Sequence, residues 1–310
     1  KKQGGVLSSF DASVQIIDSI FHANSAKSLA AVAHIDQNSS LELQTCEFLY
    51  NGINEAPYAA KEVKITLHTL LEQKFLRPFT DFTQILSKIN SELPNSITIP
   101  STETITLTPK PITTPTTTTT AISGVIHNTK NSSVTAYNCI FNSNQASLAS
   151  VLSTINNQTP TIFHHCTITN NTATTQGSTL YIQESHLQLH NTTFHNNNAP
   201  AATSITPGIY FTESTVEITN SDFSHPNDTH TNNNNNTNIF IEGVMNSDLT
   251  VKSSVFSHWV TKGTGGAVML EDCVRLMVHD CVFEHGRGGY AGAVAVVRVK
   301  NVVVEGSVFK

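Results

Sequence analysis

The chain has 310 residues, a formal net charge of −6 and only 13% charged side chains. Thr, Ser and Asn together supply 100 of the 310 residues, and because these residues favour turns and caps over helix interiors, a mainly helical or coiled-coil protein is not expected. A collagen is excluded because 15 glycines cannot fill every third position. The chain contains no block of Lys or Arg, so a nucleic-acid binder is not expected. The longest apolar run, Ala291–Val297, is too short to span a bilayer.

A repeat of about 27 residues begins near the start of the chain. Its anchor is a large apolar residue, and nine anchors align: Phe21, Phe48, Phe141, Ile168, Phe194, Phe223, Phe256, Phe283 and Phe309. From residue 141 onward they are 27, 26, 29, 33, 27 and 26 residues apart. The residues five and seven positions before each anchor are apolar except Thr161. Apolar residues at every second position are typical of β-strands, so each repeat predicts three short strands.

The three strands of one repeat cannot bury their own inward side chains. Stacking the repeats about 4.8 Å apart covers each inward residue with its equivalents above and below. Burial of one Phe or Leu contributes roughly 1.5–3 kcal/mol. We therefore predict an all-β fold, a right-handed parallel β-helix (a solenoid) of about nine to ten coils.

The corners of the predicted coils carry their own pattern. The positions three before each anchor are mostly Asn, Asp or Gly, which tolerate a left-handed backbone. Asn also stands three residues after five of the anchors, and we expect these side chains to form an amide ladder from coil to coil: Asn24, Asn51, Asn144, Asn171 and Asn197.

In chain order, residues 1–53 form the N-terminal coils of the predicted solenoid. The period is lost over 54–121, where we predict a degenerate coil at 59–71, an amphipathic helix at 79–93 between Pro78 and Pro94, and a Thr/Pro-rich loop at 99–120. Residues 122–310 form the C-terminal coils, in one solenoid with 1–53, and an Asn-rich excursion at 225–238 lengthens one corner. Because the chain starts without Met and stops within a repeat, we interpret it as a segment of a longer or processed protein.

Two short motifs recur at a fixed offset. Four repeats read F-x-x-N, and Gly265–Val268 and Ala291–Val294 read G-G-A-[ILV] or nearly so. Together the motifs resemble the repeats of the chlamydial polymorphic outer membrane proteins (Pmp) and similar repeats of eukaryotic surface proteins, within the pectin-lyase-like β-helix class. The resemblance covers about 240 of the 310 residues and excludes 54–121. It implies a parallel β-helix and, by analogy with the bacterial family, an adhesin role.

Acidic residues bear on whether the chain is an enzyme. Hydrolases and lyases of this fold need two or three clustered acids. Glu184 and Glu213 share one corner column, which the turn pattern explains without catalysis. The segment richest in ionisable groups supplies the candidate catalytic residues of an enzyme: Asp272, Asp280, Glu284, His285 and Arg298. The paired-Asp and Asn-Thr-Asp signatures of polygalacturonases are missing, so we favour a protein without catalytic activity.

Histidines and cysteines complete the candidates. His225, His258 and His285 follow their anchors by two residues, and we expect them to stack along one edge. Cys139 and Cys166 fall in an inward column with two further cysteines, near enough for a disulfide, although buried free thiols are the simpler expectation. No cysteine or histidine spacing typical of zinc occurs, so we predict no metal and no cofactor.

Seven sequons, no more than chance predicts, are candidate N-glycosylation sites: Asn38, Asn131, Asn157, Asn170, Asn191, Asn227 and Asn235.

We predict a non-enzymatic structural or adhesive module at an extracellular or cell surface. Its polar corners would contact a protein or glycan, or its ends would join further coils or copies, with no nucleic acid and no membrane span. The alternatives are a carbohydrate-active enzyme (a polysaccharide lyase or glycoside hydrolase) using acids within 271–298, and an intracellular scaffold.

Overall fold

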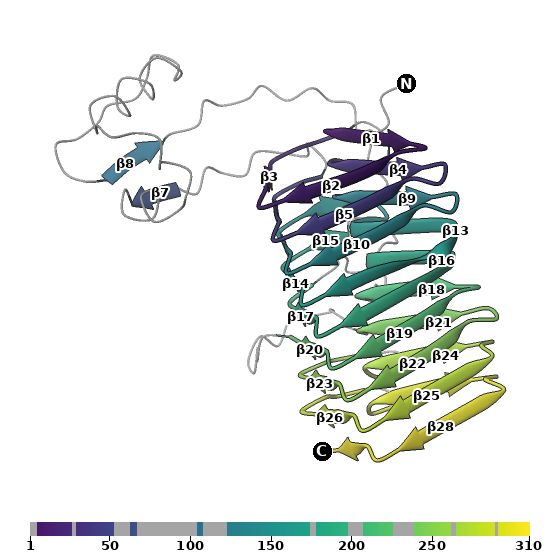
Figure 1. Ribbon diagram of the computed structural model, residues 1–310. Helices are drawn as coiled ribbons and strands as arrows, with labels where there is room; N and C mark the ends of the chain where they lie inside the picture. The colour runs from purple at the N-terminus through teal and green to yellow at the C-terminus, as the bar shows by residue number, and fades with distance from the viewer. Residues whose placement is uncertain are drawn as a thin grey trace. The chain divides into compact units, whose positions relative to one another are not determined.

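The computed structural model describes residues 5–26, 29–52, 63–66, 104–107, 123–173, 178–197, 207–225, 239–261, 265–288 and 291–310. The chain divides into two compact units, the first made of residues 1–54 and 119–310 and the second of residues 55–118. The predicted boundaries lay at 53 and 122. Within the described part of the first unit all regular structure is β, and parallel strands stack from β1 to β29 (Figure 1).

Each coil of this solenoid contributes strands to three faces. Among the described residues, face 1 stacks nine strands: β1 (Leu7–Phe10), β4 (Ala33–Asp36), β9 (Ile126–Thr129), β13 (Ala149–His164), β16 (Ser178–His190), β18 (Ile209–Thr212), β21 (Ile241–Val244), β24 (Val268–Glu271) and β27 (Val294–Val297). Face 2 contains β2 (Ser13–Ile17), β5 (Ser40–Gln44), β10 (Ser133–Tyr137), the second halves of β13 and β16, β19 (Thr215–Thr219), β22 (Asp248–Lys252), β25 (Arg275–His279) and β28 (Asn301–Glu305).

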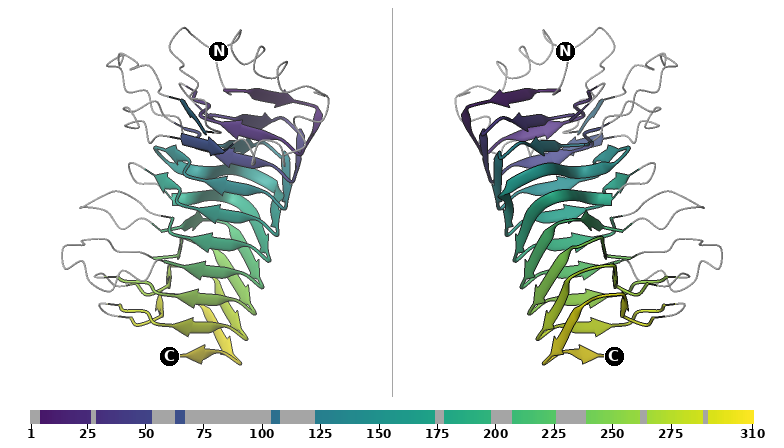
Figure 2. Two further views of the ribbon diagram at one scale, coloured as in Figure 1. Left: turned by 90° about the vertical axis from the view of Figure 1, so that its left-hand side faces the viewer. Right: turned by 90° about the vertical axis from the view of Figure 1, so that its right-hand side faces the viewer.

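Face 3 consists of short strands that hold the anchors. In the part of the chain that the structure describes, its nine members are β3 (Ile20–His22), β6 (Glu47–Leu49), β11 (Ile140–Asn142), β14 (Thr167–Thr169), β17 (Thr193–His195), β20 (Asp222–Ser224), β23 (Val255–Ser257), β26 (Val282–Glu284) and β29 (Val308–Phe309). A further short pair joins β12 (Gln145–Ala146) to β15 (Thr172–Ala173). The side views show the coils one above another along the stack (Figure 2). The predicted parallel β-helix is confirmed.

The anchors form an internal column of stacked rings. Phe48 and Phe141 lie 4.8 Å apart with 5° between their ring planes, and Phe256 and Phe283 stack with the same values. These four rings are at most 1% exposed. Because parallel pairing places each Phe directly over its equivalent, the repeat in the sequence becomes a continuous core.

The predicted amide ladder is also present. Asn144 Nδ2 donates to Asn171 Oδ1 at 3.0 Å and to the carbonyl of Phe48 at 2.9 Å. Asn51 Nδ2 donates in the same way to Asn144 Oδ1 at 3.1 Å. The ladder runs unbroken through five coils, from Asn24 to Asn197. It satisfies amide groups and turn backbone that burial would otherwise leave unpaired.

The interior includes two further features. All five cysteines are buried and free, so Cys139 and Cys166 form no disulfide. Thr161, the single polar residue in the columns five and seven positions before the anchors, accepts a hydrogen bond from Asn128 Nδ2 at 3.1 Å, and both side chains are fully buried. An internal polar contact therefore replaces an apolar one at this level of the stack.

The insertion interrupts the sequence but not the stack. β5 pairs directly with β10, placing Ser40 beside Ser133, so the coils on either side of residues 54–121 are neighbours. Within the second unit, β7 (Val63–Thr66) pairs antiparallel with β8 (Thr104–Leu107). The expectation of a degenerate parallel coil at 59–71 is therefore wrong for Val63–Thr66, whose apolar residues come into register with Leu107 and Ile105. The predicted helix at 79–93 lies outside the described residues.

Candidate functional site

The acids predicted for an enzyme lie at separate places on the solenoid. Arg298 Nε lies 2.5 Å from Asp272 Oδ1, and Arg298 Nη2 lies 2.6 Å from Glu271 Oε1. The hydrogen bond from Arg298 lowers the pKa of Asp272. These groups are exposed and occupy one corner, after β24 and β27 in adjacent coils.

The other candidates belong to different corners and faces. Asp280 lies between β25 and β26, where its carboxylate is 2.7 Å from His279 Nδ1. Glu284, at the end of β26, faces Lys310 Nζ at 3.7 Å. His285 follows Glu284, and its ring stacks on His258 with centroids 5.1 Å apart. Of the five candidates, the structure therefore brings only Asp272 and Arg298 into contact. Glu284 and His285 are near each other only because they are consecutive in the chain.

The predicted histidine column is correct for two of its three members. His258 and His285 stack, but the His225 ring is 7% exposed and stacks on Phe240 at 5.2 Å. Burial lowers the pKa of His225 to about 4. The longer repeat before His258 brings Phe240 inward beside His225, which is why the expected three-ring stack is wrong.

The sequons differ in accessibility. Asn38, Asn131, Asn170 and Asn191 are exposed, whereas Asn227 and Asn235 lie outside the described residues. Asn157 is fully buried, and its amide nitrogen donates to the carbonyl of Ser132 at 2.6 Å. The folded solenoid therefore does not present Asn157 to a modifying enzyme.

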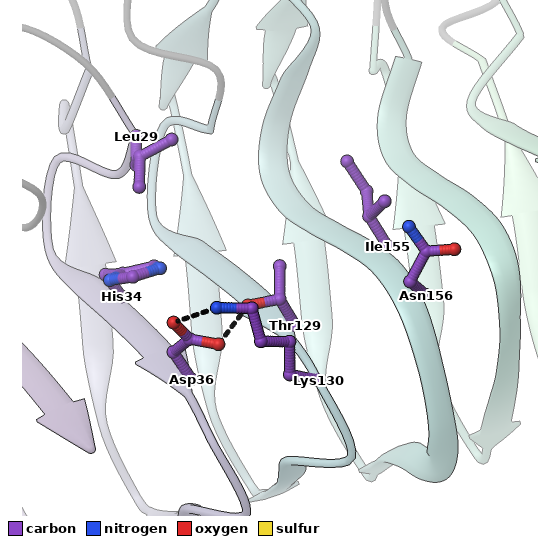
Figure 3. A pocket seen from close by; sticks show the side chains of 7 residues that line it. All are labelled: Leu29, His34, Asp36, Thr129, Lys130, Ile155 and Asn156. Atoms are coloured by element: carbon purple, nitrogen blue, oxygen red, sulfur yellow. Dashed lines mark hydrogen bonds and ion pairs between the residues drawn. The ribbon is translucent and has the colours of Figure 1, made fainter.

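A cavity that the sequence analysis did not identify opens on face 1. It has a volume of about 280 Å³ and is lined by Leu29, His34, Asp36, Thr129, Lys130, Ile155 and Asn156 (Figure 3). The lining comes from three adjacent coils because β4, β9 and β13 are neighbours in the sheet. His34 and Asp36 alternate with the buried Ile35, so they point to the outer side of β4, toward the cavity.

An ion pair occupies one side of this cavity. Lys130 Nζ lies 3.0 Å from Asp36 Oδ2, and the side chains are 61% and 7% exposed. Asp36 Oδ1 accepts hydrogen bonds from the Thr129 hydroxyl and the Gln37 amide, each at 2.9 Å. Burial by itself raises the pKa of Asp36, but the hydrogen bonds from Lys130 and Thr129 outweigh it and hold this pKa below its usual value. Asp36 is therefore ionised at neutral pH.

Two stacked imidazoles lie beside the ion pair. The His34 and His127 rings are 5.5 Å apart with 14° between their planes. Within the described part of the chain, the Nδ1 atoms of both are enclosed and lack a hydrogen-bond partner. Burial lowers the pKa of His34, and lowers that of His127 to about 4. Both rings are therefore neutral at pH 7.

One contact extends the site to a fourth coil. The Asn156 side-chain nitrogen, oriented to donate, lies 2.6 Å from Glu184 Oε2. The sequence analysis placed Glu184 in one corner column with Glu213. In the structure its carboxylate contacts the side-chain amide of Asn156 at the cavity. Asp36 is the one carboxylate among the seven lining residues.

The cavity was missed although a signal existed. His34 and His127 each stand 14 residues before their anchors, and Asp36 and Thr129 each stand 12 before theirs. The inward columns repeat the same kind of residue over nine coils. The outward columns 14 and 12 residues before the anchors change residue type at almost every coil. These four side chains come together because the coils on either side of an insertion of more than sixty residues are neighbours in the sheet.

Broader features of the described residues add two findings. No group of three or more His, Cys, Asp or Glu side chains in this part of the chain is arranged to hold a metal ion. Nor does any helix there have the length and apolar character required to cross a membrane.

No protein-family model matches the chain, and no curated protein matches it significantly.

Proposed function

We propose that this chain is a non-enzymatic structural or adhesive β-helix module that acts at an extracellular or cell surface and presents its outward faces to a partner. The observation that carries the proposal is the pairing of the candidate acids. Asp272 and Glu284 each face a cationic side chain, as in structural ion pairs, and Asp280 faces the imidazole of His279; the three acids lie in separate corners or strands.

The outward surface supports display in a second way. Ladders of hydrogen-bonded polar side chains run between neighbouring coils, for example from Asn196 Nδ2 to Asn170 Oδ1 at 2.7 Å and from Thr169 Oγ1 to Asn142 Oδ1 at 3.3 Å. Such ladders hold the polar groups of several coils in one fixed array. The resemblance of the F-x-x-N and G-G-A-[ILV] motifs to polymorphic outer membrane protein repeats supports an adhesive role at a surface.

The second candidate is a carbohydrate-active enzyme of the pectin-lyase-like class. The cavity favours it, because a buried carboxylate, Asp36, lies there beside the imidazole of His34. Glycosidases use a pair of carboxylates about 5–9.5 Å apart, and the lining of this cavity supplies one.

A paired assay tests the proposal. The chain is incubated with neutral and acidic polysaccharides while reducing ends and unsaturated products are measured, and its binding to whole cells and isolated cell walls is titrated. We expect saturable binding, no glycan release, and no effect of Asp280→Asn. Glycan release that is lost in Asp280→Asn or in Asp36→Asn would overturn the proposal in favour of the enzyme.

A further inference from the structure

We propose that the cavity lined by His34, Asp36 and Ile155 binds one neutral sugar ring of a glycan. The inference rests on the proposed adhesive function and names the ligand class that the module would hold. It places recognition on face 1, beside the corners that follow β4 and β9 and beside the middle of β13.

The charge of the cavity indicates a neutral ligand. The Asp36 carboxylate and the Lys130 ammonium form an ion pair and cancel. The imidazole of His34 is uncharged because it is buried. Beyond Asn156, the carboxylate of Glu184 adds a negative charge that would repel an acidic sugar. A uronic acid is therefore disfavoured, and a polyhydroxylated neutral ring is not.

The hydrogen-bonding groups match hydroxyls that both donate and accept. Among the described residues, Asp36 Oδ2 receives its hydrogen bond from Lys130, which leaves a lone pair on the oxygen and further N–H groups on the ammonium. The Thr129 hydroxyl donates to Asp36 and keeps its own acceptor capacity. His34 can present either a donor or an acceptor at Nε2, because no described partner fixes the tautomer at Nδ1.

The shape of the cavity limits the ligand to one ring. Its volume of about 280 Å³ lies at the lower edge of the range for small-molecule sites, roughly 300–1,000 Å³. Leu29 and Ile155 provide apolar walls on which the C–H surface of a sugar ring can pack. In Figure 3 these two side chains lie on opposite sides of the view, with the carboxylate and the ammonium between and below them, so one ligand can contact both kinds of surface.

The test uses the methyl glycosides of glucose, galactose, mannose and N-acetylglucosamine as probes, with methyl galacturonide as the acidic counterpart. Binding is measured by saturation-transfer difference NMR and by titration of the imidazole resonances. We expect at least one neutral glycoside to bind with a millimolar Kd and to shift the His34 resonance but not that of His258. Methyl galacturonide should bind at least tenfold more weakly.

Two variants locate the binding, and one matched variant controls for their side effects. Ile155→Phe fills the cavity and should weaken binding at least tenfold. Val244→Phe introduces the same ring at the equivalent position three coils further along this outward column and should leave the Kd unchanged. Asp36→Asn leaves Lys130 unpaired, so it should weaken the neutral glycoside about tenfold and strengthen methyl galacturonide. Circular dichroism verifies that each variant folds.

Three results would overturn the inference: no neutral glycoside shifts His34, Ile155→Phe binds as well as the unchanged chain, or methyl galacturonide binds as tightly as the neutral probes. The first and third need no variant. A chain that adheres to surfaces but binds no neutral glycoside contradicts this inference alone. A chain that adheres to no surface, or that releases glycan, contradicts the proposed function whatever the glycosides do.

Discussion

At the scale of single residues, one corner position keeps the same left-handed backbone conformation whichever side chain it carries. The residue three before the anchor has a positive φ in all nine described coils: Asp18, Thr45, Asn138, His165, Asn191, Asn220, Ser253, Asp280 and Gly306. Asn, Asp and Gly adopt this conformation readily, whereas a β-branched residue does so at a cost. Thr45, with φ of 53°, is therefore a strained exception.

Replacing Thr45 by Gly should stabilise the solenoid. The left-handed conformation costs a non-glycine residue about 1–2 kcal/mol, and the extra backbone entropy of Gly offsets about half of that, so we expect a gain of about 0.5–1 kcal/mol. Urea unfolding measures the difference. Thr135→Gly, within β10, is the matched control and should lose about 1 kcal/mol. Equal losses in both variants would contradict the strain at Thr45.

Asn144, in the middle of the amide ladder, should be hard to replace. Asn144→Ala leaves the Phe48 carbonyl and the Asn51 amide without their partners in a fully buried turn. Each buried group left unpaired costs about 1–3 kcal/mol, so we expect a loss of about 3 kcal/mol or more in the free energy of unfolding. Asn142→Ala, two residues earlier and half-buried, should cost under about 1 kcal/mol. A loss at Asn144 no larger than that at Asn142 would show that the ladder contributes little.

At the scale of strands and faces, the interior and exterior of the same strand obey different rules. Along β4, the inward Ala33 pairs with the apolar Leu7 and Ile126 of the neighbouring coils, whereas the outward His34 meets another imidazole. The inward contacts follow from the repeat alone. The outward contacts depend on which residue the next coil supplies, and here they enclose two ring nitrogens without partners in the described chain.

The buried histidines should make stability fall in acid. The pKa values of His127 and His225 are both lowered to about 4 in the folded chain by burial, so the unfolded chain binds protons first as the pH decreases. Their stabilising contribution is complete above the unfolded pKa of about 6.5 and is lost between about pH 6.5 and 4, at most about 3 kcal/mol for each. Glu242, whose pKa burial raises to about 6, acts in the opposite sense over part of this range.

The variant His127→Phe isolates one of these contributions. Phe keeps a ring against His34 but cannot be protonated. Urea unfolding at pH 7 and pH 4.5 should show a smaller loss of stability in His127→Phe than in the unchanged chain, by about 1–3 kcal/mol. Phe211→Leu is the control, because it alters a fully buried ring that carries no titratable group and should leave the pH dependence of stability unchanged. Identical pH profiles for the unchanged chain and His127→Phe would exclude His127 as a source.

At the scale of the whole molecule, the solenoid is continuous in space although it is interrupted in sequence. Ser40 pairs with Ser133, 93 residues away, in the way that Ser13 pairs with Ser40, 27 residues away. Coils in contact across such an interruption pay a loop-closure cost that grows only slowly with loop length. Residues 55–118 form a separate unit with their own antiparallel pair, β7 and β8.

Residues 55–118 should therefore be dispensable for the fold of the first unit. Replacing them by a short Gly/Ser linker should preserve the β-sheet circular dichroism and change the Tm by only about 2–4 °C, the shift expected for about 1 kcal/mol. Phe223→Ala, which removes a fully buried ring from the anchor column, is the destabilised reference and should lower the free energy of unfolding by about 3–5 kcal/mol. Loss of cooperative unfolding in the deletion variant would show that the two units depend on each other.

The sequence by itself determined the parallel stack, the Phe column, the amide ladder and the left-handed corners. Each of these features joins a residue to its own equivalents, so a period of about 27 residues is sufficient to specify the contact. Only the tertiary structure decided the contacts between unlike residues. It stacked His225 on Phe240, paired Val63–Thr66 antiparallel with Thr104–Leu107, separated Asp280 from Asp272, and enclosed the cavity between His34, Asp36 and Ile155. The physical reason is that inward side chains always meet the same packed core, whereas outward ones meet whatever the neighbouring coil and its loops place beside them.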